Sequence, residues 1–249
     1  MTKIKELISK ERSQYIVFIG LSIVVVGLTG IAYFSNSLIF QRFIGGINPL
    51  IASFFIIVLG FILLSFLLSK GWFAIYKKGN LKGLFYSSGL AALFGLIIIL
   101  VDFNTRLYPA DLNILFPESL LFYPAIDFFA EILFQVLPLT LILIILTSLS
   151  KKISYSKITT KINHNMIMWV SIFAVSLLEP IYQTIPLLSG QYPLWFAGFT
   201  FMHVFLIILS QLTIFKRYDF ITMYWFRLVY YILWHIVWGY MRLKLLFQS

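Results

Sequence analysis

The sequence has no cysteine and very little charge. Without cysteine the chain has no disulfide framework, no cysteine-ligated zinc or iron–sulfur cluster, and no thiol nucleophile. Only 11% of the 249 residues are charged, whereas a soluble domain has about 25%. This is too little charge to cover a water-soluble globule, so a soluble fold is excluded. Disorder is excluded as well, because 18% of the residues are aromatic and apolar runs dominate the chain.

Long apolar runs make up most of the sequence. A helix needs about 20 predominantly apolar residues to cross a bilayer, and seven runs reach that length. They are Gln14–Phe34, Pro49–Leu68, Leu81–Val101, Ser119–Thr147, Met166–Leu188, Leu194–Phe215 and Phe220–Met241. We therefore predict an all-α polytopic membrane protein, a bundle of about seven transmembrane helices that forms a single domain over residues 1–249 and lies in the cell membrane.

The basic residues are distributed unevenly between the segments that join these runs. Cytosolic loops of membrane proteins carry an excess of lysine and arginine. If the N-terminus is cytosolic, Arg227 lies within a span, and the basic residues outside are Arg42, Arg106, Arg242 and Lys244. The inside ones are Lys3, Lys5, Lys10, Arg12, Lys70, Lys77, Lys78, Lys82, Lys151, Lys152, Lys157, Lys161, Lys216 and Arg217. We therefore predict a cytoplasmic N-terminus, contact with membrane lipid and no nucleic-acid partner, and we expect the outer loop 102–118 to cap the outer face.

Ionisable side chains within the spans are candidates for function, because they are costly in lipid. The six are Asp127, Glu131, Glu179, His203, Arg227 and His235. The helical rise of 1.5 Å per residue places Glu131, Glu179, His203 and His235 about 8–18 Å below the outer face. We therefore expect these four side chains, from four helices, to converge in one pocket in the outer half of the membrane.

Two carboxylates and two imidazoles suit three kinds of chemistry. A buried carboxylate can act as general base on water while a histidine shares the proton or polarises the carbonyl. Glu131, Glu179, His203 and His235 also form a two-oxygen, two-nitrogen ligand set for a divalent metal such as zinc, although the H-E-x-x-H spacing of zincins is absent. A third use is proton or ion transfer, which is disfavoured because seven spans show no inverted repeat.

The order of these residues resembles that of a known family. Segment 130–135, Ala-Glu-Ile-Leu-Phe-Gln, resembles the E-E-x-x-x-R motif of the CPBP (ABI) family of glutamic intramembrane proteases, which process CAAX proteins and bacteriocins. Segment 175–180 stands in the place of the family's F-x-x-x-H motif, segment 196–198 resembles the opening of the next helix, and segment 235–239 resembles the closing H-x-x-x-N. The resemblance covers residues 119–241, the last four helices, and implies an intramembrane endopeptidase.

Four motif positions depart from the family pattern. In place of its catalytic glutamate, arginine, second-motif histidine and final asparagine stand Ala130, Gln135, Glu179 and Gly239. Only Glu131 and His235 match outright, so the ordinary mechanism cannot run unchanged. Either Glu179 supplies the missing carboxylate, with His203 or His235 as its partner, or the site no longer cleaves peptide bonds and the chain is a pseudoenzyme.

Further polar side chains are expected to support the pocket. They are Asp127, Gln135, Gln183 and Arg227. Asp127 precedes Glu131 by four residues and Gln183 follows Glu179 by four, so each pair shares a helical face. Arg227 lies at the estimated depth of Gln135, and we hypothesise that it replaces the arginine lost from the first motif and reaches the network of Glu131.

Each of these residues also has an ordinary structural explanation. Asp127 can be solvated near the headgroups, His203 can be a neutral core histidine, and Arg227 can extend to the interface. His235 lies between tryptophans, as in an interfacial aromatic belt. The alternative function is a non-catalytic scaffold or accessory subunit that binds another membrane protein. Residues 1–101 form additional N-terminal helices in either case.

Overall fold

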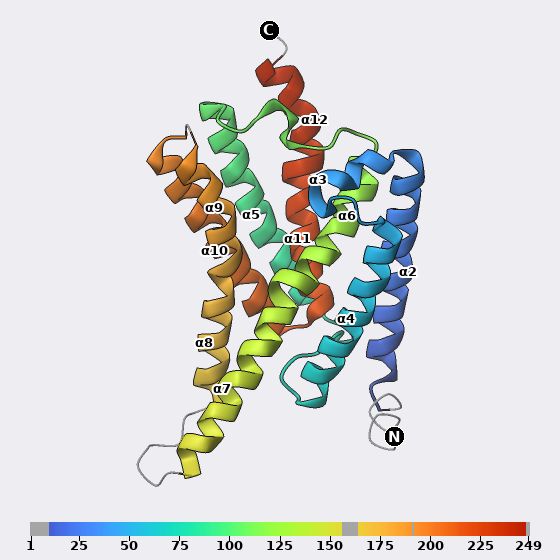
Figure 1. The fold of residues 1–249 in the computed structure, drawn as a ribbon, viewed down its shortest axis with the longest axis vertical. Helices are drawn as coiled ribbons and strands as arrows, with labels where there is room; N and C mark the ends of the chain where they lie inside the picture. Colours follow the sequence, from blue (N-terminus) through green and yellow to red (C-terminus); the bar gives the residue numbers. More distant parts are fainter. Residues whose placement is uncertain (1–9, 156–163, 191, 248–249) are drawn as a thin grey trace. The chain divides into compact units, whose positions relative to one another are not determined.

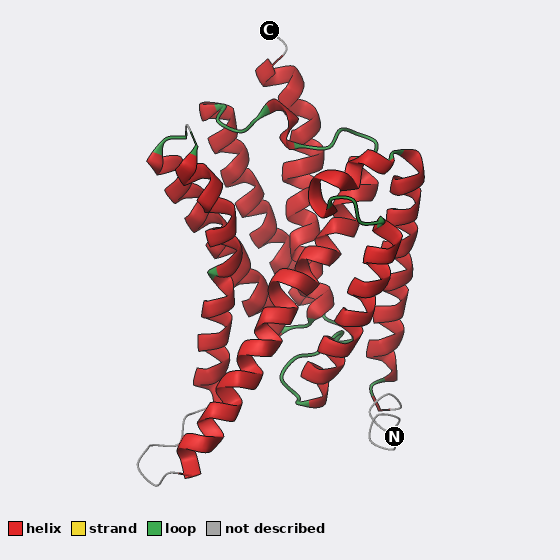
Figure 2. Cartoon of the chain, in the orientation of Figure 1, coloured by secondary structure: helices red, strands yellow, loops and turns green. Residues whose placement is uncertain are grey.

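The computed structural model describes residues 10–155, 164–190 and 192–247, which are almost wholly helical and contain no strand (Figure 1, Figure 2). Within this part of the chain, seven helices are long and apolar enough to cross a membrane. They are Arg12–Ser35, Pro49–Ser69, Leu81–Thr105, Ser119–Ser150, His164–Ser189, Leu194–Arg217 and Phe220–Phe247. The predicted all-α, seven-span membrane protein is confirmed. Of the basic residues counted above, Lys3, Lys5, Lys157 and Lys161 lie outside the described residues.

The chain divides into two compact units. The prediction of a single domain over residues 1–249 does not describe this division. The first unit comprises Met1–Ala130 and Ile214–Ser249, and the second comprises Glu131–Thr213. The helices of the first unit are α2 (Arg12–Ser35), α3 (Gln41–Ile44), α4 (Pro49–Ser69), α5 (Leu81–Thr105), α6 (Ser119–Ala130), α11 (Phe220–Tyr231) and α12 (Gly239–Arg242). Those of the second are α7 (Leu137–Tyr155), α8 (His164–Ser176), α9 (Leu178–Ser189) and most of α10 (Leu194–Arg217).

Short polar side chains cap the N-termini of three helices of the first unit. Asn48 accepts hydrogen bonds from the backbone N–H groups of Leu50 and Ile51 at 2.9 and 3.4 Å, and the next residue, Pro49, is preorganised for the first helical position. Asn80 caps α5 and Asp219 caps α11 in the same way. These caps satisfy backbone donors that have no partner within the helix.

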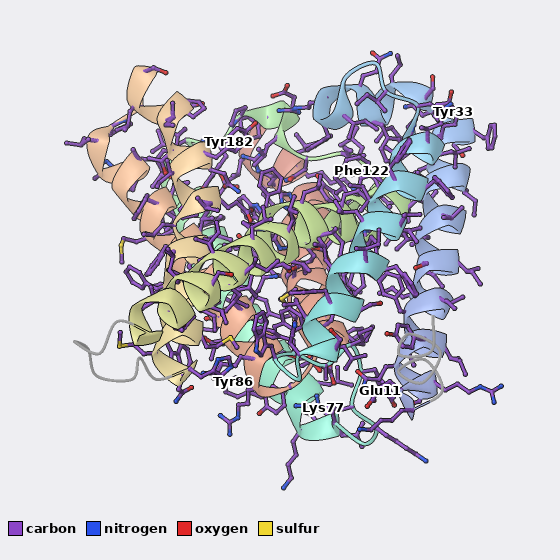
Figure 3. The ribbon with its side chains drawn as sticks, turned by 60° about the horizontal axis from the view of Figure 1, so that its bottom comes forward. Glu11, Tyr33, Lys77, Tyr86, Phe122 and Tyr182 are labelled. Carbon is purple, nitrogen blue, oxygen red and sulfur yellow. The ribbon has the colours of Figure 1, made fainter. Side chains whose placement is uncertain are left out.

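Hydrogen bonds join the segment between α4 and α5 to the N-terminal ends of α2 and α11. Gln14 of α2 accepts the backbone N–H groups of Ile75 and Tyr76 at 2.7 and 3.2 Å. Asp219, just before α11, accepts the backbone N–H of Lys77 at 2.9 Å. Figure 3 labels Lys77 and Glu11 at this end, which we call the N-terminal end of the first unit. The bonds fix one end of three helices relative to one another.

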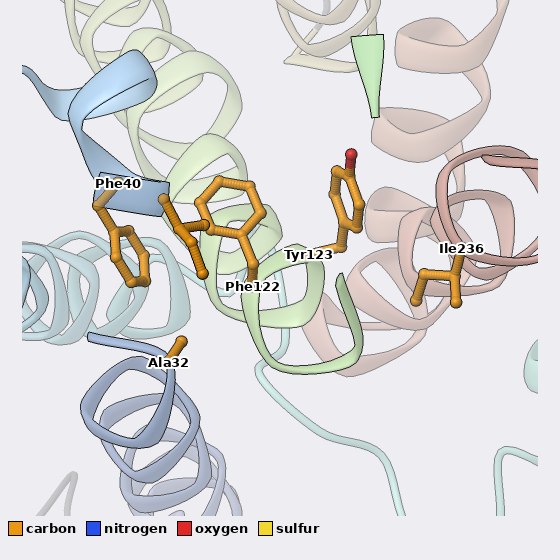
Figure 4. Packing of buried hydrophobic residues seen from close by; sticks show 6 residues of the cluster. Ala32, Phe40, Phe122, Tyr123 and Ile236 are labelled. Atoms are coloured by element: carbon orange, nitrogen blue, oxygen red, sulfur yellow. The ribbon is translucent and has the colours of Figure 1, made fainter. Parts of the chain in front are cut away.

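Apolar packing joins α2, α6 and the helix that continues α11. Within the first unit, α11 packs along α5, and α2 packs against α6 and α4. One buried cluster consists of Ala32, Ile39, Phe40, Phe122, Tyr123 and Ile236 (Figure 4). The rings of Phe40 and Phe122 have centroids 5.1 Å apart. Tyr123 lies between Phe122 and Ile236 (Figure 4), so this packing sets the position of a polar ring discussed below.

A buried ion pair closes the other end of the first unit, which carries α12 and which we call its C-terminal end (Figure 1). The guanidinium of Arg242 donates two hydrogen bonds to the carboxylate of Asp102, at 2.8 and 3.0 Å. It also donates to the carbonyl oxygens of Tyr108 and Pro109, at 2.9 and 2.6 Å. Trp238 donates to the same carboxylate at 2.7 Å. Because α5 continues to Thr105, Asp102 belongs to this helix, and the loop proper is shorter than the predicted 102–118.

We predict that the Arg242→Leu variant loses about 3–5 kcal/mol of unfolding free energy, because it leaves the Asp102 charge buried without its counter-ion. The measurement is a denaturant titration of the protein in detergent micelles. Lys244→Leu is the matched control, since Lys244 is exposed and donates its side-chain hydrogen bond to the Tyr240 hydroxyl at 2.9 Å. Equal losses in the two variants would contradict the prediction.

Candidate functional site

Glu131 lies in a chain of buried polar side chains in the second unit. It begins the π-helical turn Glu131–Val136, which interrupts the fourth span. The side-chain amide of Gln211, on α10, donates to the Glu131 carboxylate, and Gln135 donates to the Gln211 amide oxygen at 3.2 Å. All three side chains are completely buried. The Glu131 carboxylate is therefore hydrogen-bonded to a carboxamide, and Gln135 belongs to the same network.

Gln211 is not among the candidate residues predicted from the sequence. Those candidates are ionisable side chains within the spans, and a glutamine carries no charge. A signal was nevertheless present, because a primary amide within an apolar span needs a hydrogen-bond partner as much as a carboxyl group does. Its partner, however, is 80 residues away in the sequence.

Glu179 follows a break in the fifth span. Helix α8 ends at Ser176 and α9 begins at Leu178, because Pro180 has no N–H to donate to the carbonyl of Ser176. Gln183 donates its side-chain amide to Glu179 at 3.0 Å. The predicted pairing of these two residues on one helical face is therefore confirmed, and Glu179 is nearly buried.

His203 lies on α10 in the same unit as Glu131 and Glu179. Its side chain is buried and stacks on the ring of Phe199, one turn earlier, with centroids 5.3 Å apart and an interplanar angle of 22°. The three residues thus share one compact unit. The meeting of all four candidate residues in one pocket stays a prediction.

His235 belongs to the first unit. It lies in the π-helical turn Ile232–Trp238, which continues α11. Its Nδ1 atom is 2.7 Å from the carboxamide oxygen of Asn113. Its ring stacks on Tyr123, with centroids 4.5 Å apart and an interplanar angle of 18°, and Tyr231 packs edge-on at 4.8 Å. Both residues that match the family motif outright, Glu131 and His235, thus lie in π-helical turns, which occur frequently at functional sites.

The partner of His235 comes from the loop that follows α5. Asn113 is buried, with 8% of its side chain exposed. It packs on Gly239, where an added Cβ atom would lie 2.9 Å from the amide nitrogen of Asn113. The motif position that lacks its asparagine is thus covered by a carboxamide from elsewhere in the chain. No local pattern in the sequence indicates this contact, because Asn113 and His235 are 122 residues apart.

Arg227 is paired with Asp127 inside the first unit. The Nε atom of Arg227 lies 3.6 Å from the Asp127 carboxylate, and the two side chains are 2% and 0% exposed. The guanidinium also lies over the ring of Tyr231, 6.0 Å from its centroid. The alternatives of a solvated Asp127 and an Arg227 that extends to the interface are therefore wrong. The hypothesis that Arg227 reaches the network of Glu131 stays a prediction.

Among the described residues, no three histidine, aspartate or glutamate side chains are grouped so that they would hold a metal ion. The proposed ligand set of Glu131, Glu179, His203 and His235 therefore has no geometric support.

Comparison of the chain with family models, curated proteins and solved structures finds no match. The CPBP resemblance accordingly rests on the motif residues alone.

We predict that Arg227→Leu destabilises the protein by about 3–5 kcal/mol, because the Asp127 charge then stays buried without its partner. The double variant Asp127→Leu/Arg227→Leu should lose less than Arg227→Leu alone, since it leaves no uncompensated charge. Denaturant titrations in micelles compare these variants with Arg217→Leu, which removes an exposed arginine. A double variant less stable than the single one would show that the pair is not the reason for the loss.

Proposed function

We propose that this chain is a divergent intramembrane endopeptidase of the CPBP type, which hydrolyses peptide bonds of a membrane-embedded substrate. One observation carries the proposal. Glu131 and His235, the two residues that match the motifs outright, are each held by a buried carboxamide, that of Gln211 for Glu131 and that of Asn113 for His235. Such partners orient the reacting groups of hydrolases.

The acid and base of the reaction are Glu131 and Glu179. One carboxylate removes a proton from water, whose oxygen attacks the carbonyl carbon, and the other carboxyl group protonates the leaving amine. Glu179 replaces the carboxylate missing at Ala130. Glu179 follows a helix break and is 9% exposed, whereas Glu131 is completely buried. His203, in the same unit, orients the water or stabilises the oxyanion, and within the first unit His235 offers an imidazole that suits either role. A metal ion is not needed, because a carboxylate suffices to activate water.

The proposal also includes a location and a class of partner. The positive-inside count predicts that the N-terminus is cytosolic, which places the C-terminal end of the first unit on the outer side of the cell membrane. The substrate is then a membrane protein or peptide with a bond accessible from the outer half of the bilayer.

A second candidate function is a non-catalytic scaffold that binds another membrane protein. The specific observation in its favour is the engagement of Glu131 by Gln211 beside an alanine in place of the family's base. In this case the chain Glu131–Gln211–Gln135 fixes the packing of the second unit, as interhelical hydrogen bonds do in membranes, and performs no chemistry.

We predict that the purified protein cleaves lipid-embedded peptides and that Glu131→Gln and Glu179→Gln each lower the turnover by about 100-fold or more, because each removes an acid–base group. Glu118→Gln, at an acid outside the candidate site, is the control and should retain the turnover. Mass spectrometry of the products gives the rates. Cleavage at equal rates in all variants would remove both acids from the mechanism. A wild-type protein that cleaves nothing but copurifies with a second membrane protein would favour the scaffold.

A further inference from the structure

The side-chain amide of Asn113 makes a single hydrogen bond within the described residues. Its oxygen faces Nδ1 of His235 at 2.7 Å. Its nitrogen has no hydrogen-bond partner and packs against the backbone of Gly239. A buried amide nitrogen without a partner is unfavourable, so the conformation of Asn113 is held by the bond to His235 and by the loop that carries it.

The bond to a carboxamide oxygen determines which nitrogen of His235 carries the hydrogen. An amide oxygen is only an acceptor, and a neutral imidazole has one N–H group. Nδ1 must therefore donate, and Nε2 is left with its lone pair. The second nitrogen of a histidine is commonly assigned its role in this way.

We infer that Asn113 is a positioning residue that holds His235 in the Nδ1–H tautomer, so that Nε2 presents its lone pair to a water molecule. This inference rests on the proposed function and makes it more specific. Of the two roles open to His235, stabilising an oxyanion requires an N–H at the reacting side, whereas orienting water requires a lone pair. The tautomer selects the second role.

Neighbouring aromatic rings fix the orientation of the imidazole. Tyr123 stacks on one face of His235, and Tyr231 packs edge-on against it. The hydroxyl of Tyr123 accepts the backbone N–H of Ile114 at 2.9 Å. Two consecutive loop residues, Asn113 and Ile114, therefore hold the imidazole and the ring stacked on it.

The loop itself is attached to the rest of the first unit at several points. Arg242 binds the carbonyl oxygens of Tyr108 and Pro109, and Arg42 binds that of Asp111 at 2.7 Å. Asn113 follows these anchors directly. The tautomer of His235 thus depends on a loop that is distant in sequence and closed by arginine contacts.

The test is an NMR measurement of the full-length protein in micelles, with ¹⁵N-labelled histidine, at mildly alkaline pH, where an unperturbed imidazole is neutral. The chain has three histidines, and His235→Gln assigns the signal of His235. Long-range ¹H–¹⁵N correlations distinguish the two tautomers. We expect the Nδ1–H form in the wild type and in Asn113→Asp, whose carboxylate also accepts, and the Nε2–H form in Asn113→Leu. The signals of His164 and His203 should not change.

Gly239→Ala provides an independent second variant. Its added Cβ would meet the Asn113 side chain at 2.9–3.0 Å, so the flexible carboxamide must move away from its present position. We expect His235 to change tautomer here as in Asn113→Leu, although Asn113 itself is intact. A wild-type protein in the Nε2–H form, or an unchanged tautomer in Asn113→Leu and Gly239→Ala, would overturn the inference. Should Asn113→Leu fail to fold, the wild type and Gly239→Ala still decide it.

Activity measurements separate this inference from the proposed function. If the chain is a peptidase, Asn113→Leu should lower kcat by about 100-fold with little change of KM, and Asn113→Asp should restore most of it. A wild type without peptidase activity but with the Nδ1–H tautomer would refute the proposed function and, with it, the role of Nε2 toward water. An active wild type with the Nε2–H tautomer would refute only the role of Asn113.

Discussion

The ion pair of Arg242 and Asp102 is the interaction on which the C-terminal end of the first unit depends. Two guanidinium hydrogen bonds reach the carboxylate, two more reach backbone carbonyls of the following loop, and Trp238 completes the shell of Asp102. A buried charge is tolerated only when it is compensated in this way. The pair therefore attaches the loop to α12, and the attached loop brings Asn113 to His235.

Carboxamides perform the corresponding task for three further buried groups. Gln211 binds Glu131, Gln183 binds Glu179, and Asn113 binds His235. An amide supplies a hydrogen bond without adding a charge, which is an advantage where no water is available to solvate one. Such partners orient an acid or an imidazole and leave its ability to exchange a proton intact. The proposed hydrolytic site requires partners of this kind.

Local properties of the sequence were sufficient to predict the spans and one polar pair. Length and apolarity are enough to predict a transmembrane helix, whichever neighbours it packs against. The four-residue spacing of Glu179 and Gln183 places them on one helical face. The contacts of Asp102 with Arg242 and of Asn113 with His235 join residues 140 and 122 positions apart, and no periodicity encodes them. Asp102 and Arg242 were assigned to an outer loop and tail, because each lies just beyond the end of an apolar run. The buried pair of Asp127 and Arg227 was missed because each residue was interpreted alone.

The central claim is that the ion pair closes the loop over His235, and chemical labelling at the loop tests it most directly. Since the chain has no cysteine, Ile114→Cys gives a single thiol at a half-buried loop position, and its rate of reaction with a charged maleimide reports whether the loop is closed. The account predicts slow labelling when the pair is intact and clearly faster labelling when Asp102→Leu removes it. Equal rates in the two backgrounds would contradict the account.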